Sequence, residues 1–347
     1  MRSKLFVIFL VLPVLFVLHV IFFTPLFTGL DIVWYSLGSM FLLLVAFLLE
    51  KRFGTIFTSW VYRCIVGWFQ TIVLAAFLLS IAFFLDWLFV FPQGFLIAYI
   101  LTGVGVVYGF IQAQRVIITE ISLSHPKIKK PLKIGQLTDV HAFGARAKKW
   151  LSQMAEKLYE YNPDVVVLTG DILDYPSPLS PEVFTSLDKS IPHYYVLGNH
   201  EFYLGEQIAA SQASLSHVQL LRGDTRDHGS IRFIGFDDSE RKRQVFENLP
   251  LYLDKEKYNV LLYHRPVGVE DAALLGADLF LAGHTHAGQF FPMDLIVKQL
   301  FGSFYHGFHR IRSMFLYTSA GSGTRNWPLR IGHPQEIVLI TLLPEEK

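Results

Sequence analysis

Four long apolar runs in the first 115 residues constrain the fold of this 347-residue chain more than any other feature of its sequence. The runs cover residues 5–23, 32–49, 65–85 and 89–111. Each is close to the about 20 residues that an α-helix needs to cross the hydrocarbon core of a bilayer. Residues 1–115 contain only nine Lys, Arg, Asp and Glu side chains, whereas residues 116–347 contain 50. We therefore predict four membrane-spanning helices followed by a water-soluble domain.

Basic residues gather in alternate loops between these runs. They precede the first run, lie between the second and third, and follow the fourth: Arg2, Lys4, Lys51, Arg52, Arg63, Arg115, Lys127, Lys129 and Lys130. The two remaining loops contain neither Lys nor Arg. Because Lys and Arg accumulate on the cytoplasmic side of membrane proteins, we expect a multi-pass protein of the cell inner (cytoplasmic) membrane. Its N-terminus and its soluble domain should both lie in the cytoplasm.

Three simple properties argue against other classes of protein. The net charge of +1 provides no domain-wide positive field, so no nucleic acid binding is expected. The single cysteine, Cys64, cannot build a disulfide framework or a thiolate metal cluster. Ionisable side chains inside a span usually mark an ion or proton path, and the spans have almost none apart from His19 near the end of its run. A transporter is therefore disfavoured.

From Val116 onward, short apolar stretches alternate with amphipathic ones, which predicts an α/β domain. Strands are expected at residues 116–123, 132–138, 164–169, 194–197, 218–221, 231–235, 259–263, 279–282, 315–318 and 336–341. Helices are expected at residues 147–161, 181–189, 206–216, 241–248 and 267–275. Some of the later strands follow one another closely, so the sheets cannot be purely parallel. The chain divides into a transmembrane region (1–115), a basic linker with the first strand (116–132) and a soluble domain (133–347).

Polar side chains that can bind metal follow five of the predicted strands, at the point where each strand ends. They are Asp139 and His141, Asp171, Asn199 and His200, His264, and His284 with His286. Because open α/β sheets bind their ligands at the carboxyl ends of the strands, we expect these side chains to meet at one edge. The D-x-H and G-D motifs alone are weak evidence, since polar residues are common after strands, whereas G-N-H-E and G-H-T-H are each moderately specific. Their occurrence at five strand ends in succession is much stronger evidence for a site.

The types of donor indicate divalent metal ions. Apart from His200, the set contains two aspartates, four histidines and one asparagine, which suit Mn, Fe or Zn and are poorly suited to calcium. Seven donors exceed the four ligands of a tetrahedral zinc ion. They suffice for two ions about 3.5 to 4 Å apart that share a bridging carboxylate, as in two-metal hydrolases. The sequence leaves the identity of the metals open.

The soluble half of the chain resembles the calcineurin-like metallophosphoesterase family, whose motifs run D-x-H, G-D, G-N-H-E/D, H and G-H-x-H. Within that family it is similar to the bacterial branch of YkuE and YaeI type, through Gly283–Gln289 (GHTHAGQ) and Arg330–Glu336 (RIGHPQE). Ala287 replaces the usual glycine and one extra residue precedes Glu336, but neither change touches an expected ligand. The resemblance implies two mixed β-sheets in a sandwich flanked by helices, and it does not extend to residues 1–115.

The resemblance also implies a role for each polar residue. One metal ion would be held by Asp139, His141, Asp171 and His286. The second would be held by Asp171, Asn199, His264 and His284, with Asp171 as the bridge. His200 is not a ligand in such sites but faces the scissile phosphate, where it can stabilise charge or protonate the leaving alkoxide. Glu201 fixes a neighbouring loop, orients a ligand or forms a structural salt bridge.

We therefore expect a membrane-anchored phosphoesterase in which metal-activated hydroxide attacks a phosphoester, phosphodiester or pyrophosphate bond. One span is enough for tethering, so four spans indicate either a lipid-linked substrate delivered in the plane of the bilayer or a partner within the membrane. A UDP-diacylglucosamine-type pyrophosphatase is one concrete form of the first possibility. A non-catalytic, metal-stabilised membrane sensor or scaffold is an alternative of another class. Loss of a ligand would be its usual mark, and all seven are present.

Two sequence features bear on the lipid hypothesis. Basic residues surround the linker and the first ligand loop, where they would attract anionic headgroups. The apolar segment Phe290–Tyr305 directly follows the His286 loop and could dip into the membrane interface. Each feature has a plain alternative: the basic residues can reflect the positive-inside tendency, and the apolar segment can pack on its own domain.

Overall fold

The computed structural model describes residues 17–18, 20–22, 24, 26, 30–174, 182–238, 242–325 and 327–345. Its N-terminal part contains three long apolar helices: α3 (Leu30–Phe53), α4 (Ile56–Phe89) and α5 (Gln93–Gln112). Within these described ranges, all three are long and apolar enough to cross a membrane. They correspond to the second, third and fourth predicted spans. Most of the predicted span 5–23 lies outside the described residues.

Helix α4 begins at Ile56, well before the predicted start at Ile65. Thr55 caps it: its hydroxyl accepts a hydrogen bond from the N–H of Thr58, while the Thr58 hydroxyl accepts one from the N–H of Thr55. The expectation that Arg63 lies in a loop is therefore wrong. The segment 56–64 contains no glycine or proline, so the helix continues through it.

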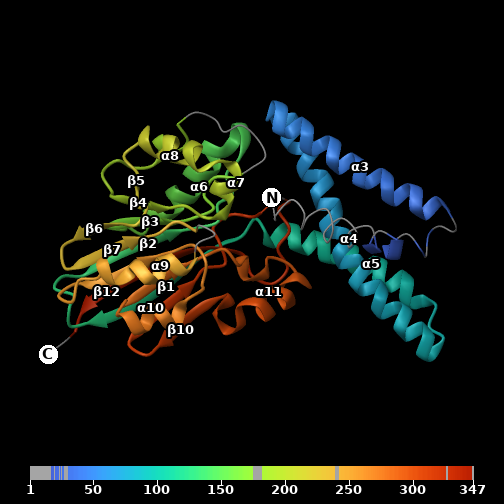
Figure 1. Ribbon diagram of the computed structural model, residues 1–347. Helices are drawn as coiled ribbons and strands as arrows, with labels where there is room; N and C mark the ends of the chain where they lie inside the picture. Colours follow the sequence, from blue (N-terminus) through green and yellow to red (C-terminus); the bar gives the residue numbers. More distant parts are fainter. Residues whose placement is uncertain are drawn as a thin grey trace.

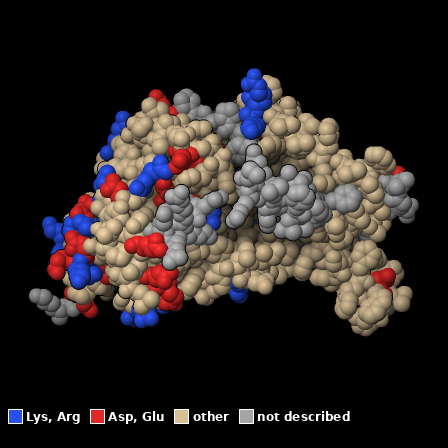
Figure 2. Space-filling view, in the orientation of Figure 1, with Lys and Arg blue, Asp and Glu red and all other residues tan. Residues whose placement is uncertain are grey.

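The helices α3 and α4 join close to the soluble domain, and the end of α5 also lies there (Figure 1). The turn between α4 and α5 lies at the far end of the helical region (Figure 1). Charged side chains are dense over the soluble domain and sparse over the helices (Figure 2). The last turn of α3 is an exception, because it carries Lys51 and Arg52.

The soluble domain is built on two six-stranded sheets. The first has the order β1 (Val116–His125), β12 (Gln335–Pro344), β2 (Leu132–Leu137), β3 (Val165–Thr169), β4 (His193–Val196) and β5 (Gln219–Leu220). The second has the order β10 (Gly307–Ile311), β11 (Met314–Thr318), β9 (Leu279–Ala282), β8 (Tyr258–Leu262), β7 (Ile231–Gly235) and β6 (Asp224–His228). Both are mixed, since β12 pairs antiparallel with β2 and β6 pairs antiparallel with β7.

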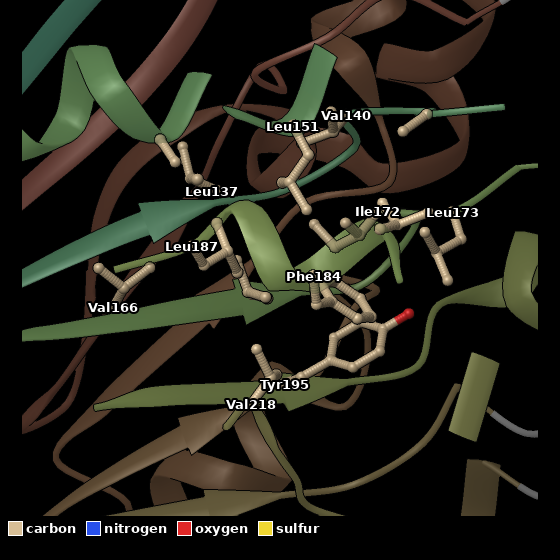
Figure 3. Packing of buried hydrophobic residues seen from close by; sticks show 14 of the residues in the cluster. Leu137, Val140, Leu151, Val166, Ile172, Leu173, Phe184, Leu187, Tyr195 and Val218 are labelled. Atoms are coloured by element: carbon tan, nitrogen blue, oxygen red, sulfur yellow. The ribbon is translucent and has the colours of Figure 1, made fainter. Parts of the chain in front are cut away.

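Alternating side chains of the strands build a layered core. In β3, Val165 and Val167 face the second sheet, whereas Val166 and Leu168 face the covering helices. Figure 3 shows this outer layer, in which Val166 lies in one cluster with Leu151 of α6. The helices are α6 (Ala147–Tyr159), α7 (Asn199–Leu204), α8 (Glu206–Ser214), α9 (Lys242–Asn248), α10 (Val269–Leu275) and α11 (Met293–Phe301). The predicted fold class, two mixed sheets flanked by helices, is confirmed.

Four elements were not predicted, and one predicted helix is wrong. Strands β6 and β10 lie at sheet edges and carry charged or polar residues in place of apolar alternation. The short helix α7 begins within the motif that supplies Asn199, and α11 is amphipathic but follows a ligand loop. The helix expected at 181–189 is only a 3₁₀ turn, Val183–Ser186, because Glu182 adopts left-handed backbone angles (φ 59°) at its start.

Candidate metal centre

The carboxyl ends of β2, β3 and β4 lie side by side in the first sheet, and those of β8 and β9 lie side by side in the second. The two edges meet: Nδ1 of His264, directly after β8, lies 2.8 Å from the carbonyl oxygen of Thr169 at the end of β3. Donation of this N–H leaves Nε2 of His264 free to bind a metal. The predicted residues from both sheets therefore face a common centre.

One group of donors forms around Asp139. Nε2 of His286 lies 3.2 Å from Oδ1 of Asp139 and 2.9 Å from Nε2 of His141. The two imidazole nitrogens and the carboxylate oxygen thus converge on one point. Such convergence of imidazole and carboxylate donors is typical of the ligands of one ion.

A second group forms around Asp171. Nε2 of His264 lies 3.1 Å from Oδ2 of Asp171 and 3.2 Å from Nδ1 of His284. Nε2 of His200 lies 3.9 Å from the same oxygen of Asp171. Candidate ligand atoms of His141, Asp171 and His200 also lie within 4.8 Å of one another, so the two groups are contiguous.

The residues present fit divalent metal ions. Oδ1 of Asp139 and Oδ1 of Asn199 are both buried, yet neither has a hydrogen-bond partner in the described part of the chain. A buried polar atom without a partner costs about 1–3 kcal/mol, and metal coordination would remove that cost. The set of carboxylate, imidazole and amide donors matches Mn, Fe or Zn.

The electrostatics point the same way. Burial lowers the pKa of a histidine, and it acts with His141 and Arg330 to hold the pKa of His286 well below its usual value. The pKa of His284 is likewise well below its usual value, because of burial and the neighbouring His264. Both are therefore neutral imidazoles, the form that binds metal. Burial also opposes charge on His264, but Asp171 and Asp139 raise its pKa to about 10. The two carboxylates thus favour a positive charge between them.

Backbone strain is concentrated at the candidate ligands. Five of the seven have left-handed backbone angles: Asp139 (φ 53°), His141 (φ 50°), Asp171 (φ 51°), His284 (φ 73°) and His286 (φ 51°). Residues other than glycine rarely adopt this conformation, and it clusters at functional sites. Gly198 and Gly283 make room for the carboxylates, because a Cβ on either would clash with the side chain of Asp171 or Asp139.

Asp174 belongs to the centre, although the sequence analysis did not identify it. It is buried, with Oδ2 2.8 Å from Nδ1 of His141 and Oδ1 2.5 Å from Nδ1 of His200. By accepting both Nδ1–H groups, it fixes the tautomers that leave both Nε2 atoms facing the site. The only signal for it was its position three residues after Asp171, in the loop Gly170–Asp174.

Glu201 fixes the loop that carries Asp171. Its carboxylate accepts hydrogen bonds from the N–H groups of Asp171, Leu173 and Gly198, at 2.8–2.9 Å, and from the hydroxyl of Tyr195 at 2.8 Å. Every one of these partners is a neutral donor. The loop-fixing alternative therefore describes Glu201, and the salt-bridge alternative does not.

Replacing Glu201 with Gln should destabilise the domain, because the amide NH₂ would face backbone N–H groups that need an acceptor. We expect a loss of about 2 kcal/mol or more, or roughly 4–8 °C in Tm for a domain of this size. Thermal unfolding of the full chain in detergent, followed by near-UV circular dichroism, measures it. Glu206→Gln is the control, since Glu206 forms only an exposed ion pair with Arg222. Equal Tm values for the two variants would contradict this role.

Arg330 ties the centre to the membrane helices. Its side chain is fully buried, and Nη2 donates to the carbonyl oxygens of Ala320 (2.9 Å) and Gly323 (2.6 Å). The N–H of Gly323 in turn donates to the carbonyl of Asp139 at 3.0 Å. The backbone N–H of Arg330 donates to the carbonyl of Gly109 in α5 at 3.0 Å. Helix α5 therefore contacts the shell of residues that supports a candidate ligand.

Comparison with known proteins agrees with this geometry. The calcineurin-like phosphoesterase family matches residues 132–288. An uncharacterized metallophosphoesterase of Helicobacter pylori (strain J99) is 32% identical over 242 residues, which cover 66% of this chain and 65% of that protein. The metallophosphoesterase YkuE of Bacillus subtilis is 27% identical over 60% of this chain and 78% of its own length.

A membrane-bound relative is also found. A transmembrane protein with metallophosphoesterase domain from Danio rerio is 28% identical over 71% of this chain and 62% of that protein. This chain thus spans slightly less than two thirds of the length of the Helicobacter and Danio proteins. The three long apolar helices indicate that this protein, too, is associated with a membrane. The matched residues and the layered fold together show that the chain contains a calcineurin-like metallophosphoesterase domain.

Proposed function

We propose that this protein is a membrane-anchored, dinuclear-metal phosphoesterase. One ion would be held by Asp139, His141, Asp171 and His286, and the other by Asp171, Asn199, His264 and His284. When bound, such a pair lowers the pKa of a shared water and polarises phosphoryl oxygens. The observation that carries the proposal is the convergence of these donors from two sheets, with unpartnered oxygens on Asp139 and Asn199.

His200 is proposed to act on the phosphate rather than to bind metal. Its backbone N–H donates to Oδ1 of Asp171 at 2.8 Å, which holds the residue against the centre. Burial lowers the pKa of His200, but Asp174 and Asp171 outweigh it, so the net shift is upward. A protonated imidazole can stabilise developing negative charge or give its Nε2 proton to the leaving alkoxide. Asp174 would hold that ring in the orientation that this transfer needs.

The direct test is elemental analysis of the purified full chain together with hydrolysis of bis-p-nitrophenyl phosphate. We expect two divalent ions per chain and turnover in the presence of Mn²⁺. One ion per chain would contradict the dinuclear site. Two ions without turnover of this or any other phosphoester would favour the sensor or scaffold alternative.

The arrangement of the helices supports one orientation of the protein in the membrane. The end of α3 with Lys51 and Arg52, the start of α4 and the end of α5 all lie beside the soluble domain (Figure 1). The positive-inside tendency therefore supports a cytoplasmic catalytic domain, residues 133–347, after a multi-pass region, residues 1–115, and a linker, residues 116–132. We propose the cell inner membrane as its location.

We further propose that the substrate is lipid-linked. Helix α11 follows the His286 loop, and none of its residues is buried. Leu295, Ile296 and Leu300 are 52%, 51% and 72% exposed, so this apolar face does not pack on its own domain. Phe291, just before α11, contacts Phe77 of α4 edge-to-face at 4.9 Å between ring centroids. A short amphipathic helix beside spanning helices suits the membrane interface, which brings the centre close to lipid headgroups.

A further inference from the structure

A cavity of about 1040 Å³ lies between the membrane helices and the catalytic domain. Its lining comes from segments far apart in sequence: Trp60 and Arg63 on α4, Trp150 on α6, and Trp327 before β12. The candidate ligand His141 also lines it. The cavity therefore lies between the membrane helices and the side of the candidate metal centre that carries His141, and no step proposed above uses it.

The part of the cavity formed by α4 and α5 is lined mainly by exposed aromatic side chains. Phe57 and Trp60, in the first turns of α4, are 71% and 63% exposed, and Phe110 of α5 is 44% exposed. Phe110 also contacts Trp327, with 6.3 Å between ring centroids. Aromatic residues at helix ends are typical of the membrane interface. Because these side chains line both the cavity and the lipid-facing surface, an acyl chain can extend along them without crossing water.

Two cationic groups, one from α4 and one from the catalytic domain, line the part of the cavity that faces the domain. The Arg63 guanidinium lies over the rings of Trp150 (4.7 Å) and Phe143 (5.7 Å). Arg146 lines the same cavity and is exposed. Neither arginine pairs with a carboxylate in the part of the chain that the structure describes. Glu156, Lys157 and Glu160 also line the cavity.

A guanidinium that lies over an aromatic ring keeps the N–H groups at its edge free to bind phosphate oxygens bidentately. The stacking on Trp150 therefore prepares Arg63 for an anionic headgroup. If Arg63 only held α4 against the domain, it would contact the two aromatic rings and would not bind an anion. The two roles make different predictions about which ligands the cavity selects.

We propose that this cavity binds an anionic amphiphile from the bilayer, with its phosphate or pyrophosphate headgroup at Arg63 and Arg146 and its acyl chain along Phe57, Trp60 and Phe110. The inference rests on the proposed function and assigns its substrate to the phosphorylated lipids. The headgroup enters beside His141, so the lipid reaches the metal centre laterally from the membrane.

Equilibrium binding to the metal-loaded full chain in detergent micelles tests the proposal. Three probes are needed: a non-hydrolysable dioleoyl phosphonate analogue of phosphatidic acid, its acyl-free glyceryl counterpart, and dioleoyl phosphatidylcholine. We expect the anionic lipid to bind at least about tenfold more tightly than either of the others. Arg63→Gln and Arg146→Gln should each weaken that binding about tenfold, or about 1.4 kcal/mol. Arg52→Gln is the matched control, because Arg52 ends α3 and does not line the cavity.

Equal binding of phosphatidylcholine, equal binding of the acyl-free phosphonate, or an equal loss in Arg52→Gln would overturn the proposal. Arg146 is exposed on the surface of the domain, so Arg146→Gln keeps the test valid if Arg63→Gln does not fold. The readout is binding and needs no turnover. A chain that binds the anionic lipid but hydrolyses no phosphoester would contradict the proposed function and leave the cavity assignment intact. A chain that hydrolyses phosphoesters but does not bind the anionic lipid would contradict the cavity assignment and leave the proposed function intact.

Discussion

Replacing Asp171 with Asn is expected to lower kcat for bis-p-nitrophenyl phosphate by at least about 10³-fold, or about 4 kcal/mol. Asp171 faces donors of both proposed ions: its Oδ2 lies 3.1 Å from Nε2 of His264, and candidate ligand atoms of Asp171 and His141 lie within 4.8 Å of each other. An amide offers one oxygen and no charge, so it cannot bridge two cations or neutralise them. Elemental analysis should show fewer than two divalent ions per chain.

Asp188→Asn is the control for this variant. Asp188 lies on an exposed loop and accepts hydrogen bonds from the backbone N–H and hydroxyl of Ser190, so its replacement should leave kcat unchanged. Wild-type protein treated with a chelator gives the floor of the assay, and Mn²⁺ should restore its activity. If Asp171→Asn keeps the wild-type kcat, Asp171 is not a metal ligand, and the two-ion mechanism is contradicted.

The candidate ligands could be found from the sequence because each follows an apolar strand that is easy to recognise. Parallel neighbours in a sheet end at the same edge, so β2, β3 and β4 deliver Asp139, Asp171 and Asn199 to one place. The pattern does not say that the second sheet turns its own edge toward the first. That arrangement depends on the core between the sheets, where Val165 and Val167 meet residues such as Val260 and Leu281.

Asp174 and Arg330 could not be assigned a role, for a different reason. A positioning residue has no preferred place in a strand pattern, since it needs only to reach another side chain. Asp174 reaches His141 and His200 from a loop, and Arg330 reaches the carbonyls of Ala320 and Gly323 from a segment about ten residues away. Such contacts depend on loop geometry, which the residue types alone do not determine.

The membrane helices show where hydropathy is sufficient and where it fails. The apolar cores of α3, α4 and α5 are recognisable by length and composition. The start of α4 is not, because Thr58, Ser59 and Arg63 interrupt the apolar run while the helix continues. Those turns line the cavity beside the catalytic domain. Of the polar residues that obscure the helix in the sequence, Ser59 and Arg63 therefore line this cavity, whereas Thr58 caps the helix.

Asp174→Asn is expected to weaken metal binding and to lower kcat, each by about 10–100-fold, the usual effect of losing a partner that orients a metal-binding histidine. Asn can accept from one Nδ1–H, but its NH₂ would face the Nδ1 of the other histidine. That ring would then carry its proton on Nε2, which points into the site. If the ring is His141, a candidate ligand is lost; if it is His200, its orientation toward the phosphate is lost.

Asp278→Asn separates this positioning effect from a general loss of stability. Asp278 is also a buried carboxylate, but it precedes β9 at the end opposite to His284 and accepts hydrogen bonds from Lys127 (2.9 Å) and from the N–H of Asn259 (2.8 Å). It should lower Tm and leave metal affinity, measured by competition with a chelator, unchanged. Asp174→Asn should instead weaken metal binding and should change the metal affinity more than it changes Tm. Equal metal affinities in the two variants would mean that Asp174 supports the loop and does not position the ligand. A residue that sets the tautomers of His141 and His200 changes the metal affinity of the folded domain, whereas a residue that only supports the loop changes its stability.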